Sequence, residues 1–246
     1  MTALTDRERR LGEGVKDPVA FAQGVLKHDV WATPAAMLRA MAQPRARVAV
    51  KACHASAKTF TAAELVIWAL TRYQKCKIVT TAPTWHQVET LLWGEIWKAA
   101  TKAAIAYPTG LNQTEWVIVE GERFAHGLST NESVKFQGYH ADEGGVVLVI
   151  IDEAPGVRPD IFEAIEGIRA GGDVRVLALG NPVIASGPFY DAFTTNREGW
   201  TTFTIGAFDS PNLAGLALED VLAMNDDELD TNVRPYLITR RWVREM

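Results

Sequence analysis

The 246-residue sequence predicts an α/β protein with a mostly parallel, doubly wound sheet flanked by helices. Two observations support this fold class. Apolar runs of strand length alternate with helical segments between residues 47 and 205, which is typical of βαβ crossovers. The run VVLVII at 146–151 has six consecutive branched apolar residues, as expected for a strand covered on both faces, and this places it near the centre of the sheet.

The composition indicates a soluble protein of a reducing cytoplasm. Its 48% hydrophobic and 22% charged residues are ordinary for a globular domain. No apolar run approaches the roughly 18 residues that span a bilayer, and the charged N-terminus has no signal-peptide core. Two cysteines, Cys53 and Cys76, have no metal-ligand spacing and argue against a disulfide framework. The net charge of −5 excludes a generally basic nucleic-acid binder, so any DNA contact is expected from local patches or an assembled ring.

The expected elements divide the chain into three parts. A helical segment at 1–45 packs on the core, the core covers 46–210, and a helical segment covers 211–246. Helices are expected at 17–31, 35–42, 59–70, 83–100, 159–168, 187–195 and 216–224. Strands are expected at 47–51, 77–81, 116–120, 123–129, 134–139, 146–151, 174–179 and 200–205, the last at a sheet edge because of its alternating threonines.

The stretch VAVKACHASAKT at 48–59 has the layout of a phosphate-binding loop between a strand and a helix. In the GxxxxGK[ST] pattern, backbone amides surround phosphate oxygens, the lysine reaches the β and γ phosphates, and the hydroxyl ligates Mg²⁺. Lys58 and Thr59 fill these last positions, but alanines replace both glycines. On this stretch alone, a helix start with a chance Lys-Thr pair is an equal alternative. The residues expected to bind nucleotide are Ala52, Cys53, His54, Ala55, Ser56, Ala57, Lys58 and Thr59.

Two carboxylates follow the central strand directly, at Asp152 and Glu153. In phosphate-loop hydrolases, an acid at the tip of a neighbouring strand holds Mg²⁺ through water, and a second carboxylate orients the attacking water. We therefore expect Asp152 and Thr59 to hold the metal and Glu153 and Lys58 to be catalytic. An Asp-Glu pair can also be a solvated loop, but the upstream strand, loop and helix favour the paired site.

Polar residues occur at three other places near the expected site. At each place a purely structural role is an alternative to a role in the site. Asn181 follows a buried strand, where it could sense the γ-phosphate or simply form a turn before Pro182. His54 could approach the phosphates or be a solvated loop residue. The corner after the second core strand holds polar side chains that could face the site or cap a helix: Thr84, His86 and Gln87.

Several of these segments together resemble the ATPase domain of the large terminase subunit of tailed bacteriophages, the DNA-packaging motor. The resemblance covers roughly residues 17–246 and rests on VAVKACHASAKT, TTAPTWHQVETLLWGEIW, VVLVIIDEAPGV, LALGNP and YLITRRWV, in that order. It implies a P-loop NTPase of the additional-strand, catalytic-glutamate type. It also implies a coupling motif at Gly180, Asn181 and Pro182.

The resemblance implies a function and partners as well. The chain is expected to hydrolyse ATP with Mg²⁺ and thereby to drive viral double-stranded DNA into a procapsid. Its expected partners are that DNA, the portal or procapsid and the small terminase subunit. A homo-oligomeric ring is expected on assembly, a monomer in isolation, no membrane partner, and a location in the host cytoplasm.

The chain departs from the family pattern in two respects. The family's adenine-contacting glutamine is missing from WATPAAML, and Gln43 is the nearest substitute. The sequence ends where the family's nuclease half would begin, so no nuclease activity is expected; the acids Asp226, Asp227, Glu228 and Asp230 are interpreted as a solvated face. Such motors also need an arginine finger, in cis or from a neighbouring subunit, and its candidates are Arg123, Arg158, Arg169 and Arg175, each of which is otherwise a surface arginine.

Two other functions compete with this interpretation. A superfamily-2 helicase-like ATPase has a similar site, but Pro155 after Ala154 and the remaining length disfavour it. A non-catalytic nucleotide-binding α/β domain is the second, because a Cβ at Ala57 would restrict the loop backbone near the phosphates.

Overall fold

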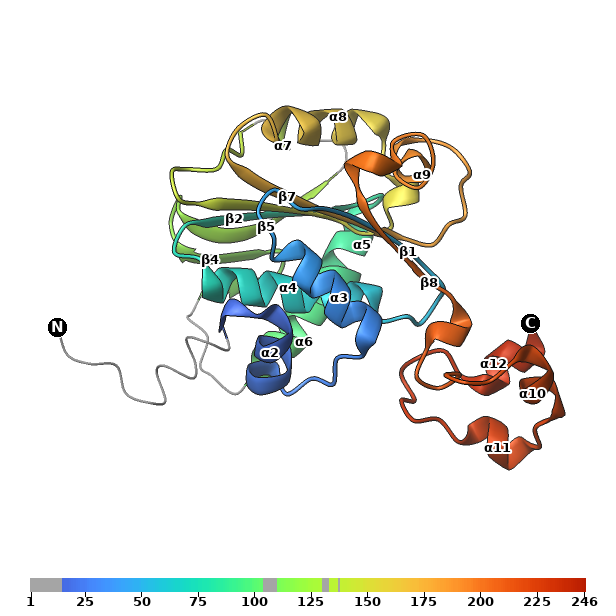
Figure 1. Ribbon diagram of the computed structural model, residues 1–246. Helices are drawn as coiled ribbons and strands as arrows, with labels where there is room; N and C mark the ends of the chain where they lie inside the picture. Colours follow the sequence, from blue (N-terminus) through green and yellow to red (C-terminus); the bar gives the residue numbers. More distant parts are fainter. Residues whose placement is uncertain (1–14, 104–109, 130–132, 137) are drawn as a thin grey trace.

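The computed structural model describes residues 15–103, 110–129, 133–136 and 138–246, with one eight-stranded sheet at its centre (Figure 1). The first 14 residues of the expected N-terminal segment lie outside the described residues. The strand order is β3-β4-β5-β2-β6-β7-β1-β8. The strands are β1 Arg47–Ala52, β2 Cys76–Ala82, β3 Leu111–Asn112, β4 Glu115–Val119, β5 Arg123–Ser129, β6 Val146–Ile151, β7 Asp173–Gly180 and β8 Thr201–Ile205.

Most strand pairs of the sheet are parallel. Those among β5, β2, β6, β7, β1 and β8 are all parallel, and β3–β4 and β4–β5 are antiparallel. All six residues of β6 are buried and the strand lies between β2 and β7, as its branched apolar sequence predicts. β8 is an edge strand, also as predicted. The fold class expected from the sequence is confirmed.

Helices cover both faces of the sheet (Figure 1). The first face carries α2 Pro18–Phe21, α3 Ala32–Met41, α4 Lys58–Arg72 and a continuous helix made of α5 Trp85–Gln87, the π-helical turn η2 Val88–Leu92 and α6 Trp93–Lys102. The second face carries α7 Ser133–Phe136, α8 Pro159–Ile168 and α9 Pro188–Asp191. Each face has its own hydrophobic cluster, so the sheet is the middle of three layers.

The helix α4 after the phosphate loop is buried on nearly every side. Residues 61–70 are all buried, which agrees with an apolar sequence that has no polar face. The one acid in this run, Glu64, is 2% exposed. A buried carboxylate needs a partner, and its partner, His28, is part of the candidate site.

Three expected elements differ from the structure. Residues 134–139 were expected to form a strand, but the described part of this segment, which omits residue 137, contains the helix α7 and no strand. Both sides of β5 and β6 are already paired, so neither strand has a free edge there. The helix expected at 17–31 ends with the π-helical turn η1 Ala22–Leu26, because Lys27 adopts a left-handed backbone with φ 62°. The helix expected at 187–195 is only α9.

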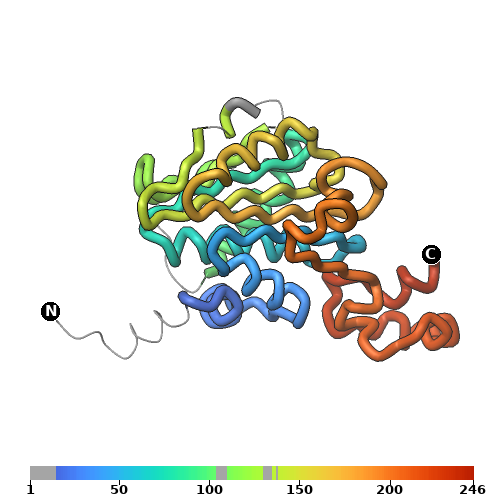
Figure 2. Tube along the Cα trace, turned by 45° about the horizontal axis from the view of Figure 1, so that its top comes forward, coloured from blue at the N-terminus to red at the C-terminus, as the bar shows by residue number. Residues whose placement is uncertain are grey.

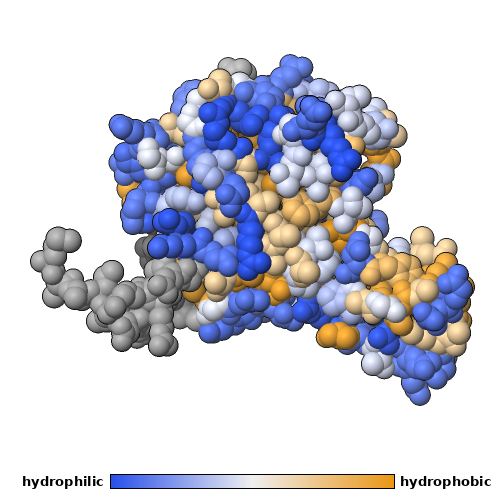
Figure 3. Space-filling model, in the orientation of Figure 1, coloured by the Kyte–Doolittle hydropathy of each residue, from blue (hydrophilic) through white to orange (hydrophobic). Residues whose placement is uncertain are grey.

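Residues 211–246 form a C-terminal lobe beside the β8 edge of the sheet (Figure 2). It contains α10 Leu218–Ala223, α11 Asp226–Asp230 and α12 Arg240–Glu245 around a small core of Leu213, Val221, Leu229 and Ile238. Of the four acids expected on a solvated face, Asp226 and Asp230 pair with Arg241 at 3.2 and 2.7 Å. Large apolar side chains are exposed on the lobe (Figure 3): Leu218, Leu222, Val233, Tyr236 and Trp242.

Candidate nucleotide-binding and hydrolysis site

The loop between β1 and α4 keeps a phosphate-loop shape without glycine. Ala57 precedes α4 with φ 62° and ψ 19°, a left-handed conformation that glycine adopts without strain. Ala55 is also left-handed, with φ 49°. Ala52, at the first glycine position, ends β1 in register with Ile205 and has no positive φ. The second glycine position therefore carries the strain and the first does not.

Backbone hydrogen bonds hold this loop from two sides. The Cys53 N–H donates to the Ile205 carbonyl at 2.9 Å, and the Ile238 N–H of the C-terminal lobe donates to the Ala55 carbonyl at 3.0 Å. Cys53 also packs against the core of the lobe. The loop is therefore fixed both by the sheet and by the lobe.

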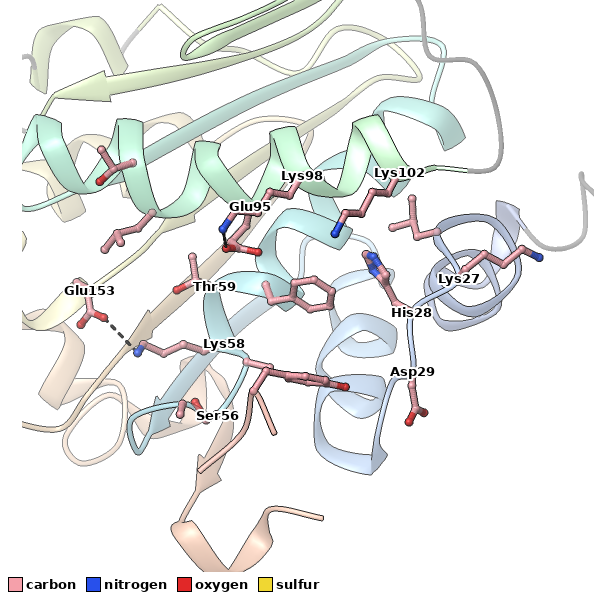
Figure 4. A pocket seen from close by; sticks show the side chains of 17 residues that line it. Lys27, His28, Asp29, Ser56, Lys58, Thr59, Glu95, Lys98, Lys102 and Glu153 are labelled. Carbon is pink, nitrogen blue, oxygen red and sulfur yellow. Dashed lines mark hydrogen bonds and ion pairs between the residues drawn. The ribbon is translucent and has the colours of Figure 1, made fainter. Parts of the chain in front are cut away.

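The four expected catalytic and metal-binding side chains lie together. In a parallel sheet the carboxyl ends of β1 and β6 are at the same edge, with β7 between them. Thr59 Oγ1 donates to Asp152 Oδ2 at 3.1 Å, and Lys58 Nζ lies 3.1 Å from Glu153 Oε1. Figure 4 shows the Lys58–Glu153 contact at one end of a cavity. The loop and the acid pair thus form one site.

Asp152 sits where a cation would stabilise it. Its side chain is 1% exposed. Burial, together with the neighbouring charge of Glu153, raises the pKa of Asp152 to about 6, although Lys58 and the Thr59 hydroxyl oppose the shift. A carboxylate and a hydroxyl are hard oxygen ligands of the kind that Mg²⁺ prefers. The donor set therefore fits the metal expected from the sequence.

Glu153 has a strained backbone, with φ 47°. Its N–H donates to Asp152 Oδ1 at 3.0 Å, and its side chain is 29% exposed. A non-glycine residue in this region costs of order 1–3 kcal/mol and is found mainly where the surrounding structure enforces it. The turn therefore directs the Glu153 carboxylate back toward Lys58.

The segment after β7 contacts the phosphate loop. Asn181 is 8% exposed, and its Nδ2 lies 3.0 Å from His54 Nδ1, while its Oδ1 is buried without a hydrogen-bond partner in the part of the chain that the structure describes. At Gly180 an added Cβ would lie 2.2 Å from Pro155 Cδ, so this position needs glycine for close packing. Pro182 is exposed. Asn181 and His54 therefore link the tip of β7 to the loop.

A cavity of about 980 Å³ extends from the phosphate loop toward the N-terminal segment. Lys58 and Glu153 lie at one end and His28 and Lys27 at the other (Figure 4). Its walls come from the loop, from the N-terminal segment, from α6 and from the lobe: Leu26, Lys27, His28, Asp29, Ala55, Ser56, Ala57, Lys58, Thr59, Phe60, Thr90, Leu91, Glu95, Lys98, Lys102, Glu153 and Tyr236. Volumes of about 300–1,000 Å³ are usual for small-molecule sites.

The structure separates several other candidates from this site. Thr84 and Gln87 form a capping box at the start of α5, so they cap a helix, and His86 is exposed outside the cavity. Gln43 is exposed and its amide donates to the Arg39 carbonyl at 3.5 Å, away from the cavity lining. Gln43 therefore does not line this cavity.

The four arginines considered as fingers lie in different elements of the fold. Arg175 is 4% exposed and donates to the Met41 and Ala42 carbonyls at 3.1 and 2.9 Å, so it is held in place. Arg123 begins β5, and Arg169 follows α8 and pairs with Glu166 at 2.7 Å, both far from the carboxyl ends of the strands. Arg158 follows the Asp-Glu turn, with a side chain that is 60% exposed.

The sequence analysis did not single out many of the cavity residues, and among these are His28, Phe60 and Tyr236. His28 fell within an expected helix, and Tyr236 is remote in sequence from every motif. One signal was available. Glu64 is a single acid in an otherwise apolar helix, and such a residue requires a buried partner.

The sequence and fold were compared with those of known proteins. No family model matches the chain. A search of curated proteins finds a probable terminase large subunit of Enterobacteria phage P7, 47% identical over 55 residues. That match spans 22% of this chain and 10% of the relative, so most of the relative lies outside it.

Solved structures match over most of the described fold. The ATPase domain of the Thermus phage P74-26 large terminase, as a mutant, has a TM-score of 0.55 and 17% identity, covering 78% of this chain and 86% of that one. The HK97 bacteriophage large terminase has a TM-score of 0.56 and 13% identity, covering 77% of this chain and 43% of that one. The chain therefore spans less than half the length of that solved chain.

The fold is that of a phosphate-loop nucleoside triphosphatase whose extra strand, β7, lies between the loop strand and the acidic strand. Within this class it is the fold of large-terminase ATPase domains, and the resemblance found in the sequence is confirmed at this level. Among the described residues, no helix is both long and apolar enough to cross a membrane.

Proposed function

We propose that this chain is an ATPase domain of a tailed-phage DNA-packaging motor, and that it hydrolyses ATP to move viral double-stranded DNA into a procapsid. One observation carries the proposal. The Lys58–Glu153 and Thr59–Asp152 contacts, both at 3.1 Å, join the phosphate loop to the acids at one sheet edge. Phosphate-loop hydrolases bring together the same parts: a lysine on the phosphates, a hydroxyl and an acid that hold the metal, and a residue that positions water.

In the proposed mechanism, Lys58 and the amides of residues 53–59 bind the phosphates. Thr59 and Asp152 would hold Mg²⁺, with Asp152 acting through water. Bound there, the metal would neutralise charge that develops on the phosphates. Glu153 orients a water molecule and accepts its proton, and Asn181 at the tip of β7 senses the γ-phosphate.

Because of the Lys58–Glu153 pair, Glu153 would become available for catalysis only when ATP is bound. While Lys58 Nζ lies 3.1 Å from Glu153 Oε1, the ion pair occupies the carboxylate and keeps it from a water molecule. When Lys58 exchanges this partner for phosphate oxygens, Glu153 becomes free to act on water. Hydrolysis would then follow binding rather than precede it.

The left-handed backbone at Ala57 supports a functional loop over a non-catalytic one. The methyl group does not prevent the conformation that glycine would adopt; it makes that conformation cost about 1–2 kcal/mol. The rest of the fold, including the hydrogen bonds at Cys53 and Ala55, offsets this strain.

The wider proposal concerns the assembly. We propose that residues 1–45 and 211–246 flank a core at 46–210, and that the chain works in the host cytoplasm with the portal or procapsid and the small terminase subunit. In a homo-oligomeric ring, Arg158 is the finger candidate that lies near the site edge. A monomer in isolation and the lack of nuclease activity stay predictions.

Binding of Mg-ATP to the purified chain tests the site. We expect Lys58→Ala to weaken binding at least tenfold, because a charged contact to phosphate is worth roughly 1.5–3 kcal/mol. Lys77→Ala is the matched control, since this lysine is ion-paired with Asp142 at 2.9 Å and does not line the cavity. Equal binding by wild type and Lys58→Ala would contradict the proposal.

A further inference from the structure

His28 lies at the end of the cavity remote from Lys58 (Figure 4), and behind it the histidine contacts a buried acid, Glu64. His28 Nδ1 lies 3.0 Å from Glu64 Oε1, and the two side chains are 14% and 2% exposed. The proposed hydrolytic mechanism uses neither residue. Burying a carboxylate in the apolar helix α4 costs free energy unless the carboxylate is paired and hydrogen-bonded.

The Glu64 carboxylate determines which nitrogen of His28 carries the proton. An ionised carboxylate only accepts hydrogen bonds, so the neutral imidazole presents Nδ1–H to it. Nε2 then carries the lone pair. In the part of the chain that the structure describes, no protein group bonds Nε2, and the His28 ring lines the cavity. His28 Nε2 is therefore available as a hydrogen-bond acceptor for a ligand in the cavity.

Aromatic and apolar side chains line the cavity together with His28. The rings of His28 and Phe60 have centroids 4.5 Å apart at an interplanar angle of 44°. Leu26 and Tyr236 line the same cavity, and Tyr236 comes from the C-terminal lobe. A flat aromatic surface beside a hydrogen-bond acceptor suits a planar heterocycle such as a purine base.

We propose that His28, oriented by Glu64, recognises the 6-amino group of adenine, in the place of the glutamine that the sequence lacks. The inference rests on the proposed nucleotide site and names its base specificity. Adenine donates a hydrogen from its 6-amino group to Nε2. Guanine and hypoxanthine present a carbonyl oxygen at the same position, so two lone pairs would face each other.

Tyr236 and Phe60 contribute differently, because stacking does not depend on which purine is present. Tyr236→Ala should weaken binding of all purine triphosphates to a similar extent and leave their ratio unchanged. His28 instead affects the ratio. The two contributions can therefore be separated in one set of titrations.

The test is displacement of ribose-labelled fluorescent ADP by ATP, GTP and ITP at about pH 8, above the ordinary pKa of histidine. Wild type should bind ATP roughly ten- to hundredfold more tightly than GTP or ITP, as expected for a mismatched buried hydrogen bond. ITP lacks the 2-amino group, so its rejection assigns the discrimination to position 6.

Variants then assign the preference to residues. His28→Phe keeps an aromatic ring but should bring the ATP to ITP ratio close to one. Glu64→Gln should narrow the ratio, because an amide can accept from or donate to Nδ1 and no longer selects one tautomer. The exposed His86, outside the cavity, is the control: His86→Phe should change nothing.

The outcomes separate the two proposals. If His28→Phe retains the full preference for ATP, or if wild type binds all three triphosphates equally, base recognition by His28 is wrong and the nucleotide site stands. If wild type binds no triphosphate, the proposed function itself fails, and the inference fails with it.

Discussion

Replacing Ala57 by glycine should stabilise the protein, whereas alanine-to-glycine changes usually destabilise. Ala57 has φ 62° and ψ 19°, and an L-residue pays about 1–2 kcal/mol for this conformation. Glycine avoids that cost but adds about 0.4–1 kcal/mol of unfolded-chain entropy. The net gain is about 0.5–1 kcal/mol, which for a chain of this size raises Tm by about 1–4 °C.

The matched control for this change is Ala36→Gly. Ala36 is exposed in α3 and has no positive φ, so glycine there should lower stability by about 1 kcal/mol. Thermal and urea denaturation without nucleotide would measure both variants. The two changes should differ in sign. If Ala57→Gly destabilises as much as Ala36→Gly, the strain assigned to the loop does not exist.

Three further predictions concern charge and polar contacts. Burial raises the pKa of Asp152 from 3.8 to about 6, so the stability that its protonated form contributes is present below pH 3.8 and lost as pH rises through about 6. Relative to Asp152→Asn, the free energy of unfolding of wild type should fall by up to about 3 kcal/mol between pH 4 and 7. Parallel pH–stability curves for the two proteins would contradict this. Arg175→Ala should cost roughly 3–5 kcal/mol in denaturation, against less than about 1 kcal/mol for the exposed Arg158→Ala; similar losses would disprove the buried role. Asn181→Ala should lower ATP turnover roughly tenfold or more with binding retained, and unchanged turnover would exclude a sensor role.

The central sheet could be predicted because its strands are encoded locally. In β6, all six residues are apolar and buried. A run of this kind is expected only in a strand that is covered on both faces, which places it inside a parallel sheet. Segment 134–139 was wrongly expected to be a strand, because its composition does not reveal that the neighbouring sheet edges are already occupied. Pairing is a property of the whole sheet and not of a segment.

The candidate site was predicted unevenly for a similar reason. Lys58 and Thr59 end the short loop after β1, and Asp152 and Glu153 follow β6 directly, so sheet topology brings them together. Thr84 and Gln87 also lie just after a strand, β2, but their side chains form hydrogen bonds that cap the helix α5. The sequence does not show which of these two roles such residues take. The contact of His28 with Glu64 joins residues 36 apart and required tertiary structure.

Hydrolysis and binding of Mg-ATP by Glu153→Gln test the central claim most directly. The change keeps the shape of the side chain and removes its ability to accept a proton. The exposed Glu163 on α8 provides the control, Glu163→Gln. We predict that Glu153→Gln binds ATP about as tightly as wild type but hydrolyses it roughly 10²–10⁴-fold more slowly. Hydrolysis by Glu153→Gln at the wild-type rate would contradict the account.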